Sequence, residues 1–191
     1  MEKKTSYKKE TKEDIIEAAS HLFSEYTYLG TSMSDIAKKL SITKAALYYH
    51  FKSKAEIYKK VLDKIFTELM STIEDALSEK TTDTKLSKLI INYLEFGMRE
   101  KNLVRALMLK IPPRKSEINK HIAYLKKQIV DLIEPLIKEV VSSKKDIKKI
   151  DNHLIISLFT SMMDGLILEY SFLDKKIDSK KISNHIIAIL F

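Results

Sequence analysis

The sequence predicts an all-α protein with about nine helices. Glycine and proline number three each among the 191 residues, and folds rich in sheets and loops need both residue types for their turns. Apolar residues recur at helical spacing along most of the chain, and no segment alternates cleanly between apolar and polar residues. The chain has no cysteine and therefore no disulfide. A chain of this length buries enough surface to fold without one.

The first four helices follow one another closely, and each has a start signal. They are predicted to cover about residues 11–26, 33–40, 43–51 and 53–73. Their N-caps are hydroxyl side chains that accept from free backbone N–H groups, namely Thr11, Ser32, Thr43 and Ser53. The spacing of Ser53 and Glu56 predicts a capping box at the start of the fourth helix.

Five further helices are predicted toward the C-terminus. They span about residues 83–99, 102–111, 116 onward, 147–173 and 178–191. Pro112 and Pro113 end the second of them, because a residue before proline disfavours the helical region. Pro135 predicts a bend inside the helix that begins near Ser116. The apolar stretch 154–168 is too short to span a membrane and predicts a helix that is buried all round.

The formal net charge of +8 favours a polyanionic partner. Five lysines lie between residues 36 and 55, in a stretch without Asp or Glu. Four more form an N-terminal arm, Lys3, Lys4, Lys8 and Lys9. This arm has no apolar run behind it, unlike a signal peptide, so we expect a cytoplasmic protein. A charge run is often just a solvated face, and its place in the fold decides its meaning.

Residues 31–54 predict a helix-turn-helix. The helices on either side of Ser41 can share an apolar core made of Ile36, Ala37, Leu40, Ile42, Leu47 and Phe51. The second helix of such a unit can enter the major groove of DNA. Its outward face carries side chains that suit base edges and phosphates, namely Thr43, Lys44, Ala45, Tyr48 and Tyr49.

Residues 11–62 resemble the tetracycline-repressor (TetR) family of bacterial transcriptional regulators. Three strings carry the resemblance: Ile16-x-x-Ala19-x-x-Leu22-Phe23, Thr31-Ser32-Met33-x-x-Ile36-Ala37 and Leu47-Tyr48-Tyr49-His50-Phe51-Lys52-x-Lys54. The resemblance implies a three-helix DNA-binding domain over residues 1–54 and a helical effector-binding and dimerisation domain over 55–191. The family usually has glycine where this chain has Thr27 and Ser41.

The resemblance also implies a set of DNA contacts. They are Ser32, Ser34, Thr43, Lys44, Ala45, Tyr48, Tyr49 and Lys54. The residues at 43–45 would face base edges, and Tyr48, Tyr49 and Lys54 would hold phosphates. Lys54 starts a helix, whose N-terminus itself favours an anion. The two tyrosines could instead be packing aromatics.

The rest of the chain should hold a ligand pocket and a dimer surface, as the resemblance implies. Adaptable and aromatic side chains suit an irregular apolar cavity, and the predicted lining is Tyr93, Phe96, Met98, Arg105, Met108, Tyr124, Phe159, Met162 and Met163. The last two helices would pair with their copies in a four-helix bundle through Leu158, Leu166, Ile182, Ile186 and Ile189. In the alternative, both sets only fill the core of one chain.

The residues and the resemblance together predict a ligand-responsive transcriptional regulator. We expect a repressor that binds a palindromic double-stranded DNA operator as a homodimer and is released by a small, apolar molecule. Two alternatives stay open, an adaptor with a protein effector and a non-specific, nucleoid-type DNA binder. An enzyme is not expected, because the histidines lack zinc-helix spacing and there is no glycine-rich phosphate loop or nucleophile elbow. No metal or cofactor is expected.

Overall fold

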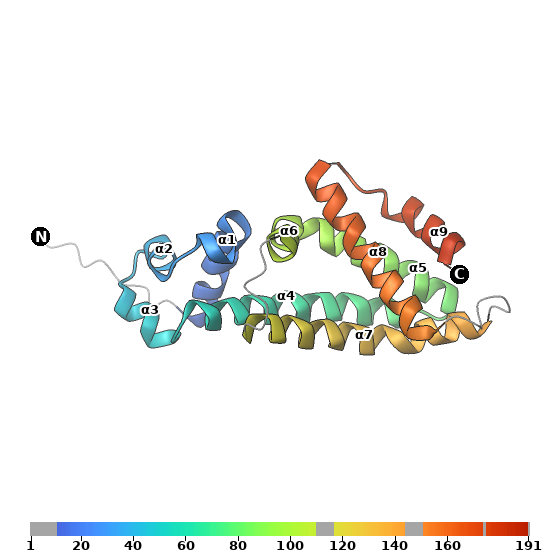
Figure 1. Ribbon diagram of the computed structural model, residues 1–191, viewed down its shortest axis with the longest axis horizontal. Coiled ribbons are helices and arrows are strands. Elements are labelled where there is room, and N and C mark those ends of the chain that lie inside the picture. Colours follow the sequence, from blue (N-terminus) through green and yellow to red (C-terminus); the bar gives the residue numbers. More distant parts are fainter. Residues whose placement is uncertain (1–10, 110–116, 144–150, 174, 191) are drawn as a thin grey trace, which may run out of the picture.

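The computed structural model describes residues 11–109, 117–143, 151–173 and 175–190, and these ranges form nine helices and no strand. The all-α prediction is therefore confirmed (Figure 1). The helices are α1 (Lys12–Gly30), α2 (Met33–Lys39), α3 (Lys44–His50), α4 (Lys54–Leu77), α5 (Thr82–Arg99), α6 (Lys101–Leu109), α7 (Glu117–Ser143), α8 (Asn152–Leu173) and α9 (Ser179–Leu190).

The helices are arranged as a small head and a longer body joined by α4. Helices α1 to α3 lie at one end of the molecule, and α4 runs from them along the body beside α7 (Figure 1). Helix α5 packs against α4, α8 and α9, and α6 packs against both α1 and α8. Two body helices, α4 and α6, therefore contact the head.

The predicted N-caps are confirmed. The side chains of Thr11, Ser32, Thr43 and Ser53 each accept from the backbone N–H three residues later. Thr11 and Ser32 also close full capping boxes. The box predicted at Ser53 is only half formed, because the Glu56 carboxylate accepts from the backbone N–H of Lys52 at 2.7 Å instead.

One helix limit differs from the prediction. The penultimate helix begins at Asn152 and not near Ile147, because Asp151 is non-helical and its carboxylate accepts from the His153 N–H at 2.9 Å. Pro135 lies inside helix α7, as predicted, and the bend expected there stays a prediction. Pro112 and Pro113, like the lysines of the N-terminal arm, lie outside the described residues.

The composition of helix α8 predicts burial on all sides, and this prediction is wrong. One face packs into the chain through Ile155, Ile156, Phe159, Met163 and Ile167. The opposite face exposes about half of Leu154, Leu158, Phe172 and Leu173. The helix is also longer than its apolar stretch, and its length and composition alone would suffice to cross a membrane, although a third of it is buried within the chain.

Three aromatic rings join the head to the body. The Phe23 and Tyr58 ring centroids are 4.8 Å apart in an edge-to-face arrangement. The Tyr28 ring lies 4.8 Å from that of Tyr58 and 6.1 Å from that of Phe23. Burial raises the pKa of the Tyr58 phenol well above its ordinary value. Because Phe23 and Tyr28 belong to α1 and Tyr58 to α4, the cluster fixes the head against the first turns of α4.

Candidate nucleic-acid interface and ligand cavity

The helix-turn-helix core is confirmed. Ile36, Leu47 and Phe51 are almost fully buried, and so is Ala37. Leu40 and Ile42 are partly buried against the same core. With this face of α3 inside, the opposite face must point outward.

The turn between α2 and α3 depends on Ser41 in the left-handed region, at φ 57°. The backbone N–H of Ser41 donates to the Lys38 carbonyl at 3.1 Å, and that of Ile42 donates to the Ala37 carbonyl at 3.0 Å. Thr27 also has a positive φ of 66°, which interrupts α1. These are the two positions at which the family usually has glycine, and here non-glycine residues accept the strain.

The outward face of α3 is open to solvent. Thr43, Lys44 and Ala45 are exposed at the start of the helix. Tyr48 is 51% exposed and Tyr49 is 84% exposed, so neither tyrosine is a core residue. The Thr43 hydroxyl accepts from the Ala46 N–H at 3.1 Å, which leaves its proton free to donate. The face therefore combines donors, an ammonium and a methyl group, which suit phosphates and base edges.

The two serines of α2 lie in different settings. Ser32 is exposed, and its hydroxyl donates to the Asp35 carboxylate at 2.6 Å within the capping box. This hydrogen bond, with a backbone bond from the same serine, lowers the pKa of Asp35. Ser34 is half-buried on α2. Ser32 is thus already engaged in holding the start of α2.

Lys54 is tied to the protein itself. Its ammonium donates to the main-chain carbonyls of Tyr28 at 2.7 Å and Thr31 at 2.6 Å. It also lies 4.3 Å from the centre of the Tyr28 ring. Burial lowers the pKa of this lysine, against the opposing effect of Asp35. In this structure Lys54 caps the end of α1, and its contact with a DNA phosphate stays a prediction.

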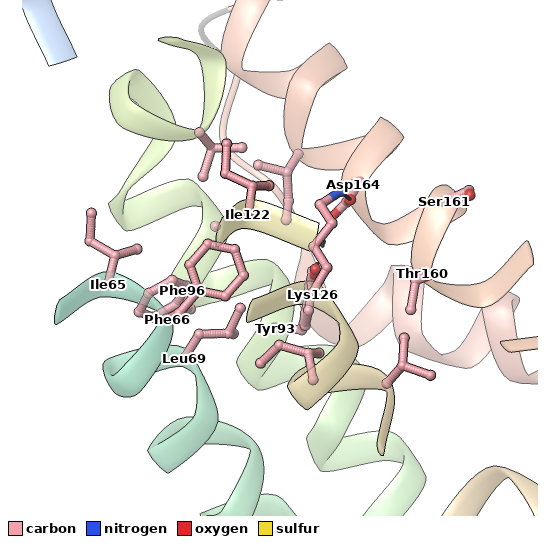
Figure 2. A pocket seen from close by; sticks show the side chains of 15 residues that line it. Ile65, Phe66, Leu69, Tyr93, Phe96, Ile122, Lys126, Thr160, Ser161 and Asp164 are labelled. Carbon is pink, nitrogen blue, oxygen red and sulfur yellow. Dashed lines mark hydrogen bonds and ion pairs between the residues drawn. The ribbon is translucent and has the colours of Figure 1, made fainter. Parts of the chain in front are cut away.

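The body contains a cavity of about 230 Å³. It lies between α4, α5, α6, α7 and α8 (Figure 2). Its lining residues are Ile65, Phe66, Leu69, Tyr93, Phe96, Gly97, Val104, Ile122, Lys126, Ile129, Val130, Thr160, Ser161, Asp164 and Ile167. Tyr93 and Phe96 are the two residues of the predicted lining that line it.

The other predicted lining residues lie elsewhere. Phe159 and Met163 are buried in the core, where Met162 also packs. Tyr124 is 58% exposed and stacks on His121. Met98 and Arg105 are half-buried without reaching the cavity, and the Met108 side chain lies outside the described part of the chain.

Sequence reasoning missed the contribution of α4 to the cavity wall, and on α7 it chose Tyr124 instead of the residues that line the cavity. Ile65, Phe66 and Leu69 have the spacing of ordinary core residues, so only the three-dimensional arrangement reveals the space beside them. One signal was available, since Asp164 interrupts an apolar stretch. A partly buried carboxylate needs a partner, and here Tyr93 and Lys126 supply two.

The predicted dimer residues are divided between surface and core. Leu158 is 50% exposed and Ile189 is 74% exposed. Leu166 and Ile182 are partly buried, and Ile186 is buried within its own chain. Gly165 has no other atom within 4 Å of the position of a β-carbon, so α8 is open at this point.

Among the described residues no three potential ligand side chains are grouped for a metal ion.

Known proteins resemble this chain in sequence and fold. Residues 15–61 match the bacterial regulatory proteins of the tetR family. The chain is 32% identical over 170 residues to IcaR of Staphylococcus aureus (strain Newman), the HTH-type negative transcriptional regulator of the biofilm operon icaADBC, with 86% of each protein covered. FadR of Bacillus subtilis, solved with stearoyl-CoA, has a TM-score of 0.78 and 22% identity, covering 92% of this chain and 95% of FadR. AibR, solved with isovaleryl coenzyme A and operator DNA, has a TM-score of 0.77 and 20% identity, covering 95% of this chain and 98% of AibR.

Proposed function

Since this chain belongs to the TetR family of bacterial transcriptional regulators, we propose that it is a repressor that binds a two-fold symmetric operator as a homodimer and leaves it when a small molecule fills the cavity. The chain is a DNA-binding regulator and not an enzyme. IcaR, a relative at 32% identity, is a negative transcriptional regulator, which supports repression.

The exposed face of α3 is the observation that carries the proposal. Helix α3 buries Leu47 and presents two neighbouring tyrosines to solvent, an exposed aromatic surface of the kind that marks an interaction site. The same face suits a major groove, with Thr43 and Lys44 at the end of the helix that enters first. Nearby lysines attract the DNA phosphates, and this attraction weakens as the salt concentration rises.

A homodimer would supply the second recognition helix. One helix-turn-helix makes few contacts, and two copies related by a two-fold axis double them. The exposed apolar face of α8, with Leu154 and Leu158, supports such pairing, because a soluble surface rarely leaves large apolar side chains together. Gly165 would let a second helix approach closely, and Ile189 of α9 would extend the interface.

The cavity is proposed as the effector site. FadR and AibR are solved with acyl-CoA molecules, which supports small-molecule binding within this fold. Helix α4 reaches from Lys54 at the head to Leu69 at the cavity wall, about 22 Å at 1.5 Å per residue. Helix α6 lines the cavity with Val104 and packs on α1. A ligand that displaces either helix would therefore move the head.

The test is selection of duplexes from a random pool by the full-length protein at about 150 mM salt. The proposal predicts enrichment of a motif with two-fold symmetry. A pool that is retained but stays random would support the non-specific, nucleoid-type alternative. A motif without symmetry would overturn the homodimeric reading.

A further inference from the structure

The cavity has an apolar end and a polar end. Ile65, Phe66 and Phe96 form the apolar end, and Tyr93, Lys126 and Asp164 gather at the other (Figure 2). Lys126 and Asp164 are the charged residues among those described as lining the cavity. A ligand that fills this space must therefore bring an apolar body and a group that suits this pair.

Asp164 is the fixed member of the pair. The phenol of Tyr93 donates to Oδ1 of Asp164 at 2.8 Å. Burial raises the pKa of Tyr93 well above its ordinary value, and the nearby carboxylate raises it further, so the phenol keeps its proton and this hydrogen bond. The Asp164 side chain is 21% exposed, and its negative charge is held in the cavity wall.

Lys126 is the movable member of the pair. Its ammonium lies 3.1 Å from Oδ2 of Asp164, but its side chain is 58% exposed. An ion pair this open to water contributes little to stability. Lys126 can turn into solvent at little cost, whereas Asp164 would then need another cation, because a carboxylate inside a protein is costly without a partner.

We infer that the effector is a small amphiphilic cation, an amine whose protonated nitrogen replaces the Lys126 ammonium on Asp164 while its apolar part fills the space beside Phe66 and Phe96. The inference rests on the proposed function, in which this cavity is the effector site. A cavity of 230 Å³ equals the volume of about eight water molecules at roughly 30 Å³ each. A chain of about eight carbons is of that size.

An anionic amphiphile fits the same cavity less well. Its carboxylate or phosphate would draw Lys126 away and come to lie beside Asp164. Two like charges in a partly buried site oppose binding, or force one of them to take up a proton. The fixed negative charge thus selects against anions, and the movable positive charge leaves room for a cation.

Isothermal titration calorimetry of the full-length protein at pH 7 tests the inference with four probes that share a chain length, octylamine, octanoate, octanol and octanoyl-CoA. Octylamine is expected to bind most tightly. Asp164→Asn should weaken octylamine by about tenfold or more and leave octanol unchanged. Lys126→Met should tighten octylamine, because it removes the competing ammonium.

Lys126→Met gives opposite results for the two charge classes. Octanoate or octanoyl-CoA binding more tightly than octylamine, and losing affinity in Lys126→Met, would overturn the cationic effector and leave the effector site intact. Octanol binding equally to the wild type, Asp164→Asn and Lys126→Met, with octylamine binding no more tightly than octanol, would also overturn the cationic effector and leave the effector site intact. Failure of all four probes would contradict the effector site itself. The asparagine amide oxygen still accepts from Tyr93, and matching thermal melts of the three proteins control for folding.

Discussion

At the scale of single residues, two backbone positions carry strain that a glycine would relieve. Thr27 has φ 66° and ψ 172°, a region that glycine alone enters easily. Its buried hydroxyl oxygen has no hydrogen-bond partner. Ser41 has φ 57° in the turn before α3. Both positions lie in the head, so their strain lowers the stability of the DNA-binding unit and not of the body.

Glycine at these positions should stabilise the protein. We expect Thr27→Gly to raise the free energy of unfolding by about 1–2 kcal/mol and Ser41→Gly by about 0.5–1 kcal/mol, after the entropic cost of glycine. Urea unfolding measures both. Ser41→Ala keeps the positive φ and serves as the control, which should gain nothing. Equal stability of Ser41→Gly and Ser41→Ala would contradict the strain.

The Asp35 carboxylate links the stability of the head to pH. Hydrogen bonds from Ser32 lower the pKa of Asp35 in the folded state. A lowered carboxyl pKa stabilises the fold above the unfolded value, near 3.8, and this stabilisation is lost as the pH falls through the folded value. Asp35→Asn should be less stable than the wild type at pH 7, and this difference should begin to shrink as the pH falls below 3.8. Thermal melts from pH 7 to about pH 3 measure the difference, and a constant gap across that range would refute the linkage.

At the scale of helices, the crossing of α5 and α8 depends on Gly97. A β-carbon at this position would lie 2.2 Å from Cδ1 and 2.6 Å from Cγ1 of Ile167. Both residues also line the cavity. The absence of a side chain at Gly97 therefore lets Ile167 reach between the two helices and shape the cavity wall.

A double-mutant cycle tests this contact. We expect Gly97→Ala to destabilise the protein by about 1–3 kcal/mol through overpacking. In the Ile167→Ala background the same substitution should cost much less, because the clashing atoms are gone. Chemical unfolding of the four proteins gives the coupling energy. If Gly97→Ala costs the same free energy of unfolding in both backgrounds, the contact with Ile167 is not the source of that cost.

The helices were largely predictable and the cavity was not. The N-caps at Thr11, Ser32, Thr43 and Ser53 are local signals, and the structure confirms each. The helix start at Ile147 and the full capping box at Ser53 were predicted wrongly, because competing local hydrogen bonds decide both. The cavity wall could not be predicted. Leu69 of α4 and Phe159 of α8 both have the spacing of core residues, but of these two Leu69 lines the cavity and Phe159 does not. Packing between distant segments makes that difference.

At the scale of the whole molecule, the exposed face of α8 decides the oligomeric state that we propose. Leu158→Lys should give a monomer in sedimentation equilibrium, because a buried ammonium in a dimer interface lacks a partner. Leu158 is half exposed in the single chain, so the monomer should keep its fold. Leu29→Lys is the matched control, since Leu29 is 62% exposed on α1. A dimer that survives Leu158→Lys would move the interface to another face.

The central claim is that the exposed face of α3 reads an operator. Fluorescence anisotropy at about 150 mM salt tests it most directly, with the duplex enriched by selection and a shuffled duplex of the same composition. We predict a preference of roughly 10³ or more for the enriched duplex. Lys44→Ala and Tyr48→Phe should each weaken that complex, while Lys180→Ala on α9 should not. Equal affinity for both duplexes, or variants of α3 that bind like the wild type, would contradict the account.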